Sequence, residues 1–504
     1  MTRKKTLDSI GSQTYDLVIV GGGITGAGVL LEASKIGYKT LLIEKGDFSS
    51  GTSSKSAKLV HGGLRYLQFF YFKLVRESLV ERNHLLQEYA HIVKPLEFIF
   101  PLYQSSFKFR IGMILYQMMG KHDLLPKYAF ENKEKTLGRL NAINSQNLKG
   151  SFIYYDGITN DSRLTAEIIF ESKQYSNSTA INYLELTNSN QTDEGYTLTC
   201  TDHTSPKTLE IKTKYVVNCG GPWTDKILDT LIPQAPDFMA PSKGVHLVFS
   251  QDRIPMKSAY AFSSNANDKR MFYALPWEHN SVIIGVTDTD YDGDLDNVEI
   301  DTDDVSYMLH GINSFLPKLK VTTDDILYQF VGLRPLFKDE IASKDRSRDF
   351  KIWWSNDRVV NLAGGKLTTF RAMAKALIKD ILPKLKASES KPTEPLNLNA
   401  EAPNFLSKDK TEHITKQYGK YNSYLFDLIH KNKALGNWLD EEFQVLNVEI
   451  AFFVKYQDCY YIEDVLNRRL ALGYVLDKHP KNKLIIEKVS QIFQQYIAPK
   501  KDEK

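Results

Sequence analysis

The sequence has few cysteines, and none is placed to bind a metal or to build a disulfide framework. Only three occur in 504 residues, at Cys200, Cys219 and Cys459, and none belongs to a C-x-x-C pair or has a histidine at metal-ligand spacing. Disulfide-rich secreted proteins and zinc modules are therefore not expected, and no metal site is predicted. A reducing, cytoplasmic setting fits this cysteine usage best.

Long apolar runs and a strong net charge are also missing. No uninterrupted apolar stretch approaches the roughly 20 residues that span a bilayer, and the polar segment before Tyr15 lacks the apolar core of a signal peptide. The formal net charge is only +3, so nothing indicates a nucleic-acid partner. The basic residues at 3–5 and 500–501 are interpreted as solvated tails. We expect a protein that does not cross a membrane but is able to lie on one.

The most informative feature present is a strand–helix–strand segment near the N-terminus. An apolar strand at 17–20 leads into Gly21-x-Gly23-x-x-Gly26, an amphipathic helix follows, and a second apolar strand ends at Glu44. Gly21 permits the tight turn, Gly23 lets the backbone approach a pyrophosphate, and Gly26 lets helix and strand pack closely. The helix N-terminus favours the negative pyrophosphate, and Glu44 is placed to accept hydrogen bonds from a ribose. The segment predicts dinucleotide binding.

Glycine clusters at three strand ends favour a flavin over a nicotinamide. They lie at 21–28, 219–221 and 363–365, whereas a simple NAD domain completes its nucleotide site within one Rossmann half. Late glycines before a final helix suggest a second segment that closes over a long, buried cofactor such as FAD. The helix N-terminus at 366–369 could stabilise negative charge on a reduced flavin. The alternative is that 363–365 is only the turn before a helix.

The length and the changes of pattern along the chain predict several domains. At 504 residues the chain is too long for one core. Residues 245–286 are typical of an antiparallel sheet, and 386–404 have linker composition with a helical segment beyond. We predict a fold of class α/β plus α+β: a Rossmann-type FAD-binding domain, an antiparallel-sheet substrate domain and a C-terminal helical domain. The predicted bounds are 14–388 for a discontinuous oxidoreductase module (FAD-binding about 14–90, 150–240 and 350–388; substrate domain about 91–149 and 241–349), 389–403 for the linker and 404–504 for the helical domain.

Individual helices and strands are expected from the periodicity of apolar residues. The predicted helices include 71–90, 107–125, 162–174 and 368–385, and the predicted strands include 180–186, 195–200, 209–211 and 215–218. The helix at 107–125 is apolar nearly all round with basic residues near its ends. It could lie in a membrane interface, and the alternative is a core helix of the substrate domain.

Several runs of the sequence resemble the FAD-dependent glycerol-3-phosphate dehydrogenases of the aerobic respiratory type. They are TSSKSAKLVHGGLRYLQFFYFKLVRESLVER (52–82), VGLRPL (331–336), SRDF (347–350), AGGKLTTFRAMA (363–374) and EDVLNRRLALG (463–473). One departure is Ala57, which stands where the family usually carries a hydroxyl residue. The calcium-binding hands of the mitochondrial members and the insertion of the soluble oxidases are not found.

The resemblance implies a reaction, a cofactor and partners. Glycerol 3-phosphate would be oxidised to dihydroxyacetone phosphate by hydride transfer from C2 to N5 of FAD, and the electrons would pass to a membrane quinone. The protein would then lie peripherally on the inner face of the cytoplasmic membrane. The sequence leaves open a homodimer, the identity of the quinone and the way in which the membrane is contacted.

A phosphate monoester requires fixed positive charge, which the arginine fork supplies in pairs of hydrogen bonds. The candidates carried over by motif are Arg65, Arg270, Arg334 and Arg348. A surface ion pair is the alternative for each of them. It is less apt for Arg334, which sits in the constrained apolar run GLRP. Arg348 lies in a charged neighbourhood, so its assignment depends on the resemblance.

Oxidation of a secondary alcohol is helped by a base beside its hydroxyl group. His61 is the first choice, and a histidine that only hydrogen-bonds the backbone or the flavin is the alternative. His246 and Lys366 are the other candidate bases, while Tyr66 and Thr368 could orient substrate hydroxyls. The predicted catalytic residues are His61, Arg65, Arg334 and Lys366; those predicted to bind substrate are Arg65, Tyr66, Arg270, Arg334, Arg348, Lys366 and Thr368. The predicted cofactor contacts are Gly21, Gly23, Gly26, Glu44, Thr52, Ser53, Ser54, Lys58, Leu59, His61, Gly220, Gly365, Lys366, Leu367 and Thr368.

Four other functions compete with this one. An oxygen-using glycerol-3-phosphate oxidase would produce peroxide, and an amino-acid oxidase would need one arginine for a carboxylate. A flavoprotein scaffold or redox sensor would keep the glycines at 21–28 without the arginines. An NAD-binding regulator would be colourless.

Overall fold

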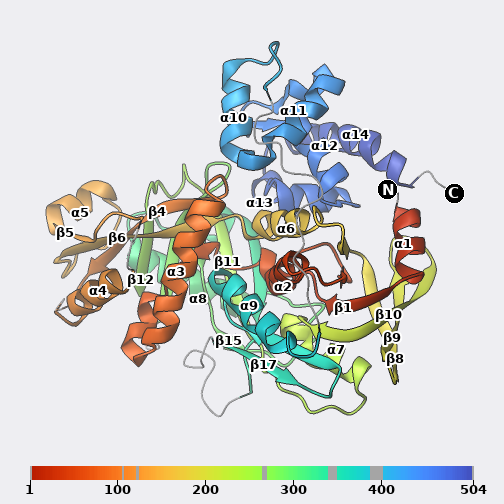
Figure 1. Ribbon diagram of the computed structural model, residues 1–504. Helices are drawn as coiled ribbons and strands as arrows, with labels where there is room; N and C mark the ends of the chain where they lie inside the picture. The colour runs from red at the N-terminus through yellow and green to blue at the C-terminus, as the bar shows by residue number, and fades with distance from the viewer. Residues whose placement is uncertain are drawn as a thin grey trace.

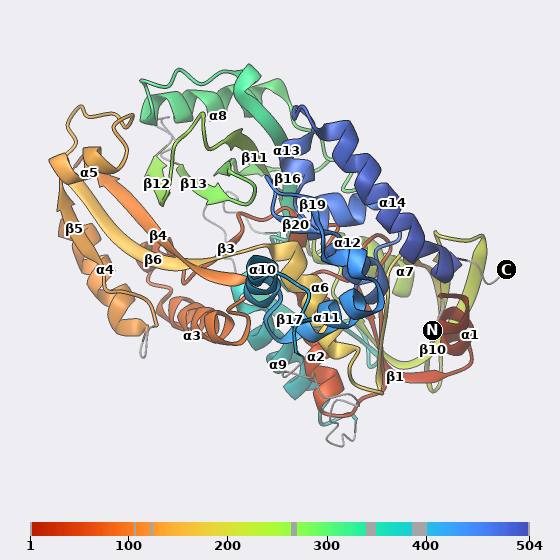
Figure 2. The ribbon, with the colours of Figure 1, turned by 90° about the horizontal axis from the view of Figure 1, so that it is seen from above.

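Two β-sheets and a C-terminal group of helices make up the structure, a computed structural model (Figure 1). It describes residues 3–104, 107–120, 124–263, 270–338, 349–385 and 401–501. Most of the predicted linker at 389–403 and the candidate Arg348 lie outside these ranges. The C-terminal helices lie above both sheets in Figure 1, and Figure 2 gives the view from that side.

The first sheet is the Rossmann-type sheet that the sequence predicts. Its strands run in the order β17-β18-β10-β1-β2-β7, and the five from β18 to β7 are parallel. Helices α2, α6 and α9 cover one face, and α1, α7 and the β8–β9 hairpin cover the other. Both faces are thus buried, which explains the continuous apolar runs of these strands. The strands are β1 (Thr14–Val20), β2 (Thr40–Ile43), β7 (Ser178–Ile181), β8 (Leu184–Thr192), β9 (Gly195–Asp202), β10 (Lys207–Asn218), β17 (Phe350–Trp354) and β18 (Val359–Gly364).

Two predicted strand boundaries are wrong in this sheet. The predicted strand at 180–186 is split into β7 and β8, because Tyr183 takes a positive φ of 55°. The predicted strands at 209–211 and 215–218 form one strand, β10. Its first half pairs antiparallel with β9 and its second half pairs parallel with β1, so the pattern changes within a single element.

The second sheet is largely antiparallel, as predicted for the substrate domain, with one parallel pair between β4 and β12. Helix α8 covers one face, and α4 packs on part of the other. β3 and β6 pair here, although the sequence division places their residues in the FAD-binding part. The strands are β3 (Leu59–Val60), β4 (Val93–Leu102), β5 (Ala129–Asn132), β6 (Gly150–Thr159), β11 (Ser242–Ser250), β12 (Ala259–Ser263), β13 (Met271–Trp277), β14 (Ser281–Gly285), β15 (Thr289–Asp290) and β16 (Ile326–Arg334).

The helices follow the predicted periodicity, with shorter ends. The helix expected at 107–125 ends at Met119 among the described residues, and the one expected at 368–385 runs from Phe370 to Ile381 after a short 3₁₀ turn. These helices are α1 (Arg3–Gly11), α2 (Ile24–Lys35), α3 (Phe72–Glu88), α4 (Phe107–Met119), α5 (Lys133–Arg139), α6 (Asp161–Ser172), α7 (Thr224–Leu231), α8 (Thr302–Phe315) and α9 (Phe370–Ile381). The 3₁₀ turns used below are η1 (Thr52–Ser54), η2 (Leu64–Phe69) and η6 (Leu367–Thr369).

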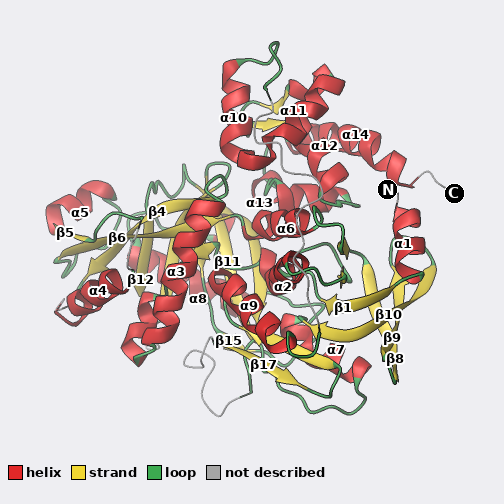
Figure 3. Cartoon of the chain, viewed as in Figure 1, coloured by secondary structure: helices red, strands yellow, loops and turns green. Residues whose placement is uncertain are grey.

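The C-terminal part is mainly helical (Figure 3), and its apolar core is shared with Phe170 of α6 and with Val248, Ile283 and Phe330 of the second sheet. It also contains one short strand pair that the sequence did not predict. In the residues that the structure describes, no helix combines the length and apolar character needed to cross a bilayer. The elements are α10 (Lys408–Tyr418), α11 (Asn422–Lys431), β19 (Trp438–Asp440), β20 (Val445–Leu446), α12 (Asn447–Tyr456), the π-helical turn η9 (Asp464–Arg469), α13 (Gly473–Leu476) and α14 (Asn482–Lys501).

The interpretation of the N-terminal basic run as a solvated tail is wrong for Arg3. Residues Leu7 and Ile10 of α1 are buried against the first sheet, which anchors the helix. Arg3 is thereby brought to the Asp202 carboxylate at 2.5 Å, and it also donates to the Asn182 carbonyl at 2.7 Å. Its buried ion pair is satisfied by hydrogen bonds, as a buried charge requires.

Candidate active site

A groove of about 680 Å³ runs along the carboxyl-terminal edge of the parallel strands. The strands β1, β10 and β18 are neighbours, so the three glycine-rich turns that follow them meet at this edge. Ligand clefts usually have volumes in this range and position. Of the residues predicted to bind the cofactor, those that line the groove are Gly21, Gly23, Glu44, Thr52, Ser53, Gly220, Gly365, Lys366 and Leu367.

The glycines of the first turn are required by close backbone contacts. Gly21 has a φ of 114°, and a Cβ there would lie 2.6 Å from the Cys219 carbonyl oxygen. A Cβ at Gly26 would lie 1.9 Å from the Gly21 carbonyl oxygen, so only glycine allows this helix–strand contact. Gly23 precedes the first residue of α2 and lines the groove with it. The N-terminus of α2 therefore faces a space that suits a pyrophosphate.

Glu44 is fixed at the end of β2 by backbone amides. Its carboxylate accepts hydrogen bonds from the Gly22 amide at 2.7 Å and the Gly46 amide at 2.9 Å. Burial raises the pKa of Glu44. Ser53 accepts a hydrogen bond from the Ile24 amide at 2.9 Å, which caps α2 from the following loop. The groove thus presents the parts that a dinucleotide needs.

Lys58 is not among the groove-lining residues. Its ammonium group donates to the Asp161 carboxylate at 2.8 Å and to the Ser54 carbonyl at 2.5 Å, and only 2% of the side chain is exposed. The lysine therefore ties its loop to α6. The remaining predicted cofactor contacts outside the groove lining are Gly26, Ser54, Leu59, His61 and Thr368.

His61 lies beside two other predicted site residues at one end of the groove. Its amide donates to Thr368 Oγ1 at 3.1 Å, and Lys366 lines the groove itself. The Lys366 ammonium lies 3.9 Å from the ring centroid of Tyr66. Burial, followed by the positive charges of Lys366 and Arg82, lowers the pKa of His61 to about 3. The imidazole is therefore neutral at physiological pH.

The loop that carries His61 is held by residues that the sequence analysis missed. The Gly62 amide donates to the Tyr116 hydroxyl at 2.8 Å, and that hydroxyl donates to the Asp156 carboxylate at 2.9 Å. Arg82 also donates to Asp156, at 2.7 Å. Tyr116 belongs to α4, 54 positions from Gly62, and no local spacing connects the two.

Arg334 and His246 form a second group, in which Arg334 is next in the chain to a residue that lines the groove. Arg334 donates to Asp288 at 3.1 Å and to the Thr287 carbonyl at 2.8 Å, and the next residue, Pro335, lines the groove. The His246 ring stacks on Phe330 with centroids 4.6 Å apart. Neither of its ring nitrogens has a hydrogen-bond partner among the described residues. Burial, then Arg334 and Lys58, lowers the pKa of His246 well below 6.5.

Among the other predicted arginines, Arg270 is not brought to these groups. The Arg270 guanidinium lies 5.7 Å from the ring centroid of Tyr307 on α8. This helix covers the face of the second sheet to which Val245 and Leu247 point, whereas His246, between them in β11, points to the opposite face. The side chain of Arg65 and the whole of Arg348 lie outside the described residues.

One carboxylate bridges the walls of the groove, and sequence reasoning gave no sign of it. Asp296 accepts a hydrogen bond from the Trp223 indole at 2.8 Å and pairs with Lys226 at 3.0 Å. It also pairs with Lys45, which follows Glu44. The loop 295–299 therefore crosses the groove and lines it.

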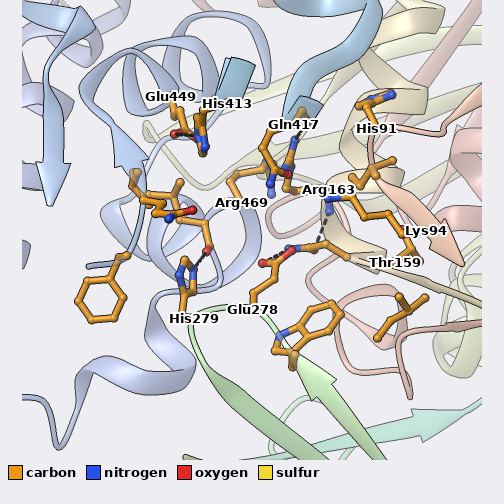
Figure 4. A pocket seen from close by; sticks show the side chains of 18 of the residues that line it. His91, Lys94, Thr159, Arg163, Glu278, His279, His413, Gln417, Glu449 and Arg469 are labelled. Carbon is orange, nitrogen blue, oxygen red and sulfur yellow. Dashed lines mark hydrogen bonds and ion pairs between the residues drawn. The ribbon is translucent and has the colours of Figure 1, made fainter. Parts of the chain in front are cut away.

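A second pocket of about 290 Å³ lies between the C-terminal part, the second sheet and the start of α6 (Figure 4). It contains several charged groups, but many of them are paired with one another or with near neighbours. His413 pairs with Glu449 at 2.9 Å, and Arg163 pairs with Glu167 at 3.3 Å. Across the described ranges, no cluster of histidine, cysteine or acidic side chains is arranged to hold a metal. We therefore assign the chemistry to the groove.

Comparison with known proteins agrees with the prediction of a dinucleotide cofactor. A family model described as FAD dependent oxidoreductase matches residues 16–379. A glycerol-3-phosphate dehydrogenase from a Synechocystis species is 30% identical, and the alignment covers 94% of this chain and 92% of that protein. An aerobic glycerol-3-phosphate dehydrogenase from Bacillus subtilis is 34% identical, with 78% and 71% covered. The solved glycerol-3-phosphate dehydrogenase of Bacillus halodurans, complexed with FAD, has a TM-score of 0.76 at 26% identity, covering 99% of this chain and 92% of the other.

These matches span most of the sequence and most of each relative. The glycine cradle, the helix N-terminus and the anchored Glu44 fit the cofactor that the family model names. FAD is therefore the cofactor of this protein, and the groove is its candidate site. The chain belongs to the FAD-dependent oxidoreductases and, among them, to the glycerol-3-phosphate dehydrogenase family.

Proposed function

We propose that the protein oxidises sn-glycerol 3-phosphate to dihydroxyacetone phosphate and passes the electrons to a membrane quinone. The observation that carries this proposal is the position of His61, whose backbone is bound to Thr368 and which lies near the positive charge of Lys366, a residue that lines the FAD groove. FAD, when bound, supplies the hydride acceptor, its N5 atom, for the hydrogen on the substrate C2. The relatives named as glycerol-3-phosphate dehydrogenases support the choice of substrate.

The residues of this chain bind the phosphate group, accept the proton and orient the substrate hydroxyls. Lys366 and Arg334 supply positive charge for the phosphate group. Arg334 is held in place by Asp288, so little further ordering is needed when a substrate binds. His61 accepts the proton of the C2 hydroxyl, and His246 is the second candidate base. Tyr66 and Thr368 orient the substrate hydroxyls, and Arg65 and Arg348 add further positive charge.

An exposed apolar surface next to the site supports contact with a membrane. Phe70 is 76% exposed and Met118 is 68% exposed. The first belongs to an aromatic turn at 69–72 and the second to α4. Leu67, just before this turn, and Tyr116 of α4 belong to one small apolar cluster. We name residues 69–72 and the exposed face of α4 the apolar rim. Basic side chains lie around it, as in segments that bind lipid interfaces: Lys73, Arg76 and Arg110.

The electron acceptor is tested by supplying glycerol 3-phosphate with either a soluble quinone analogue under nitrogen or oxygen alone. A quinone-reducing dehydrogenase reduces the analogue many times faster than it consumes oxygen. Oxygen consumption with equimolar peroxide, and no faster turnover with the quinone, would identify an oxidase instead. Absence of turnover with both acceptors would contradict the proposed reaction.

A further inference from the structure

The loop at 45–58, which we name the FAD loop, joins β2 to β3 and supplies much of one wall of the groove. Its groove-lining residues include Ser50, Gly51, Thr52, Ser53 and Lys55. The opposite side of the loop is in contact with the C-terminal part of the chain. These contacts are made at two places, and both lie in or next to the run at 463–473 that the sequence analysis singled out.

The first contact is a buried carboxylate held by two arginines. Asp47 accepts hydrogen bonds from both terminal nitrogens of Arg469, at 3.0 and 3.1 Å, and from Arg468 Nε at 2.6 Å. The side chains of Asp47 and Arg469 are both 0% exposed. Asn182 donates a further hydrogen bond to Asp47 at 3.0 Å. A bidentate pair of this kind fixes orientation as well as distance.

The second contact is made by Tyr474 of α13, close to η1. Its hydroxyl donates to the Ser54 carbonyl at 3.3 Å. Its ring centroid lies 5.5 Å from the Lys58 ammonium, the group that also binds Asp161 and the Ser54 carbonyl. The C-terminal part therefore contacts the FAD loop near both of its ends, on the side away from the groove.

Both arginines belong to the π-helical turn η9, and a further contact within the turn fixes Arg468. Asp464 pairs with Arg468 within the turn and accepts a hydrogen bond from the Tyr183 hydroxyl at 2.6 Å. The family model for FAD-dependent oxidoreductases ends at residue 379. Residues 464–474 therefore lie outside the part of the chain that this family model matches.

We propose that residues 464–474 act as a latch that preorganises the FAD loop and slows the release of FAD. Arg469 is a positioning residue, since its partner is Asp47 and not a groove-lining group. A loop that is already ordered costs little further conformational entropy when the cofactor binds. Without the latch, part of the binding free energy of FAD is used to order the loop, so the affinity of the protein for FAD falls.

The test measures the rate of FAD release from diluted holoenzyme by the rise in flavin fluorescence. Arg469→Met is expected to accelerate release about tenfold or more, which corresponds to about 1.4 kcal/mol. Arg469→Lys is expected to recover part of the difference. The matched control is Lys420→Met, which removes a 2.7 Å ion pair between the C-terminal helices and Glu171 of α6 without touching the FAD loop.

A double variant separates the latch from general stability. Asp47→Asn with Arg469→Met removes both charges, so no buried ion is left without its partner. We expect its unfolding temperature with saturating FAD to stay near that of the wild type while FAD release remains fast. Release at the wild-type rate in the double variant, or in Arg469→Met, would overturn the proposal. Equal acceleration by Lys420→Met would also overturn it, because the effect would then belong to the interface in general.

Discussion

His61 differs from an exposed histidine first in its burial and then in the charges that surround it. Lys366 and Arg82 oppose its protonation, and Thr368 holds its backbone. A neutral imidazole next to a lysine suits a site that binds an anion and removes a proton. In the proposed reaction, Lys366 binds the phosphate group and His61 accepts the proton of the C2 hydroxyl.

At this scale, His61→Ala is expected to lower the rate of flavin reduction by glycerol 3-phosphate about a hundredfold or more, the usual loss when a general base is removed. The apparent substrate dissociation constant should change far less, because Lys366 and Arg334 remain. Rapid-mixing absorbance at several substrate concentrations separates the two quantities. An unchanged rate would exclude His61 as the base and leave His246 to be tested.

The pH dependence provides a second readout at the same residue. Because the pKa of His61 is lowered to about 3, the group stays unprotonated as the pH falls through 6.5. The second-order rate constant for flavin reduction should therefore not fall as the pH drops through 6.5, the pKa of an ordinary histidine, on account of His61. The folded state should lose stability between pH 6.5 and pH 3, since the unfolded chain binds this proton more readily. An acidic limb near 6.5 that vanishes in His61→Ala would contradict this account.

Helix α4 shows how one element serves two purposes. Its inward face buries Met113 and Tyr116, and the Tyr116 hydroxyl fixes the backbone of the loop beside His61. Its outward face exposes apolar side chains such as Met118. The inward face agrees with the interpretation of 107–125 as a core helix, whereas the interfacial helix stays a prediction that concerns the outward face.

The apolar rim gives a prediction for this element. The double variant Phe70→Ser with Met118→Ser is expected to reduce binding to anionic phospholipid vesicles severalfold, because apolar area that would enter the interface is lost. Flavin reduction by soluble substrate should stay within about twofold, as neither residue contacts the groove.

The control for the rim is Phe405→Ser, which removes another exposed aromatic side chain from the C-terminal part. Flotation of protein with vesicles measures binding directly. If the rim variant floats as well as the wild type, or if Phe405→Ser lowers flotation equally, the membrane contact lies elsewhere.

The whole molecule shows which parts of the fold depend on residues that are close together in the sequence. The strand, the glycine turn, the helix and Glu44 follow one another within 30 residues, so the Rossmann unit and dinucleotide binding were predictable from spacing. The choice of FAD came from the later glycine clusters and the family resemblance. The contact between Asp47 and Arg469 joins residues 422 positions apart, and no periodicity encodes it. Arg3 was misassigned for the same reason, because its partner Asp202 is 199 positions away.

The site was partly predictable at this scale. The motif residues His61, Tyr66, Lys366 and Thr368 come together because β3, η2 and η6 meet at one end of the groove. Arg270 does not join them, since strand alternation and α8 place it on the other face of the second sheet. Alternation is visible in a sequence, but which face carries the site is decided only when the sheets pack together.

The measurement that tests the central claim most directly is an anaerobic absorption spectrum of the purified protein before and after addition of substrate. The account predicts that sn-glycerol 3-phosphate bleaches the oxidised flavin band within seconds, and that glycine, proline and unphosphorylated glycerol leave it unchanged over the same time. A flavin that glycerol 3-phosphate fails to bleach, or that an amino acid bleaches as fast, would contradict it.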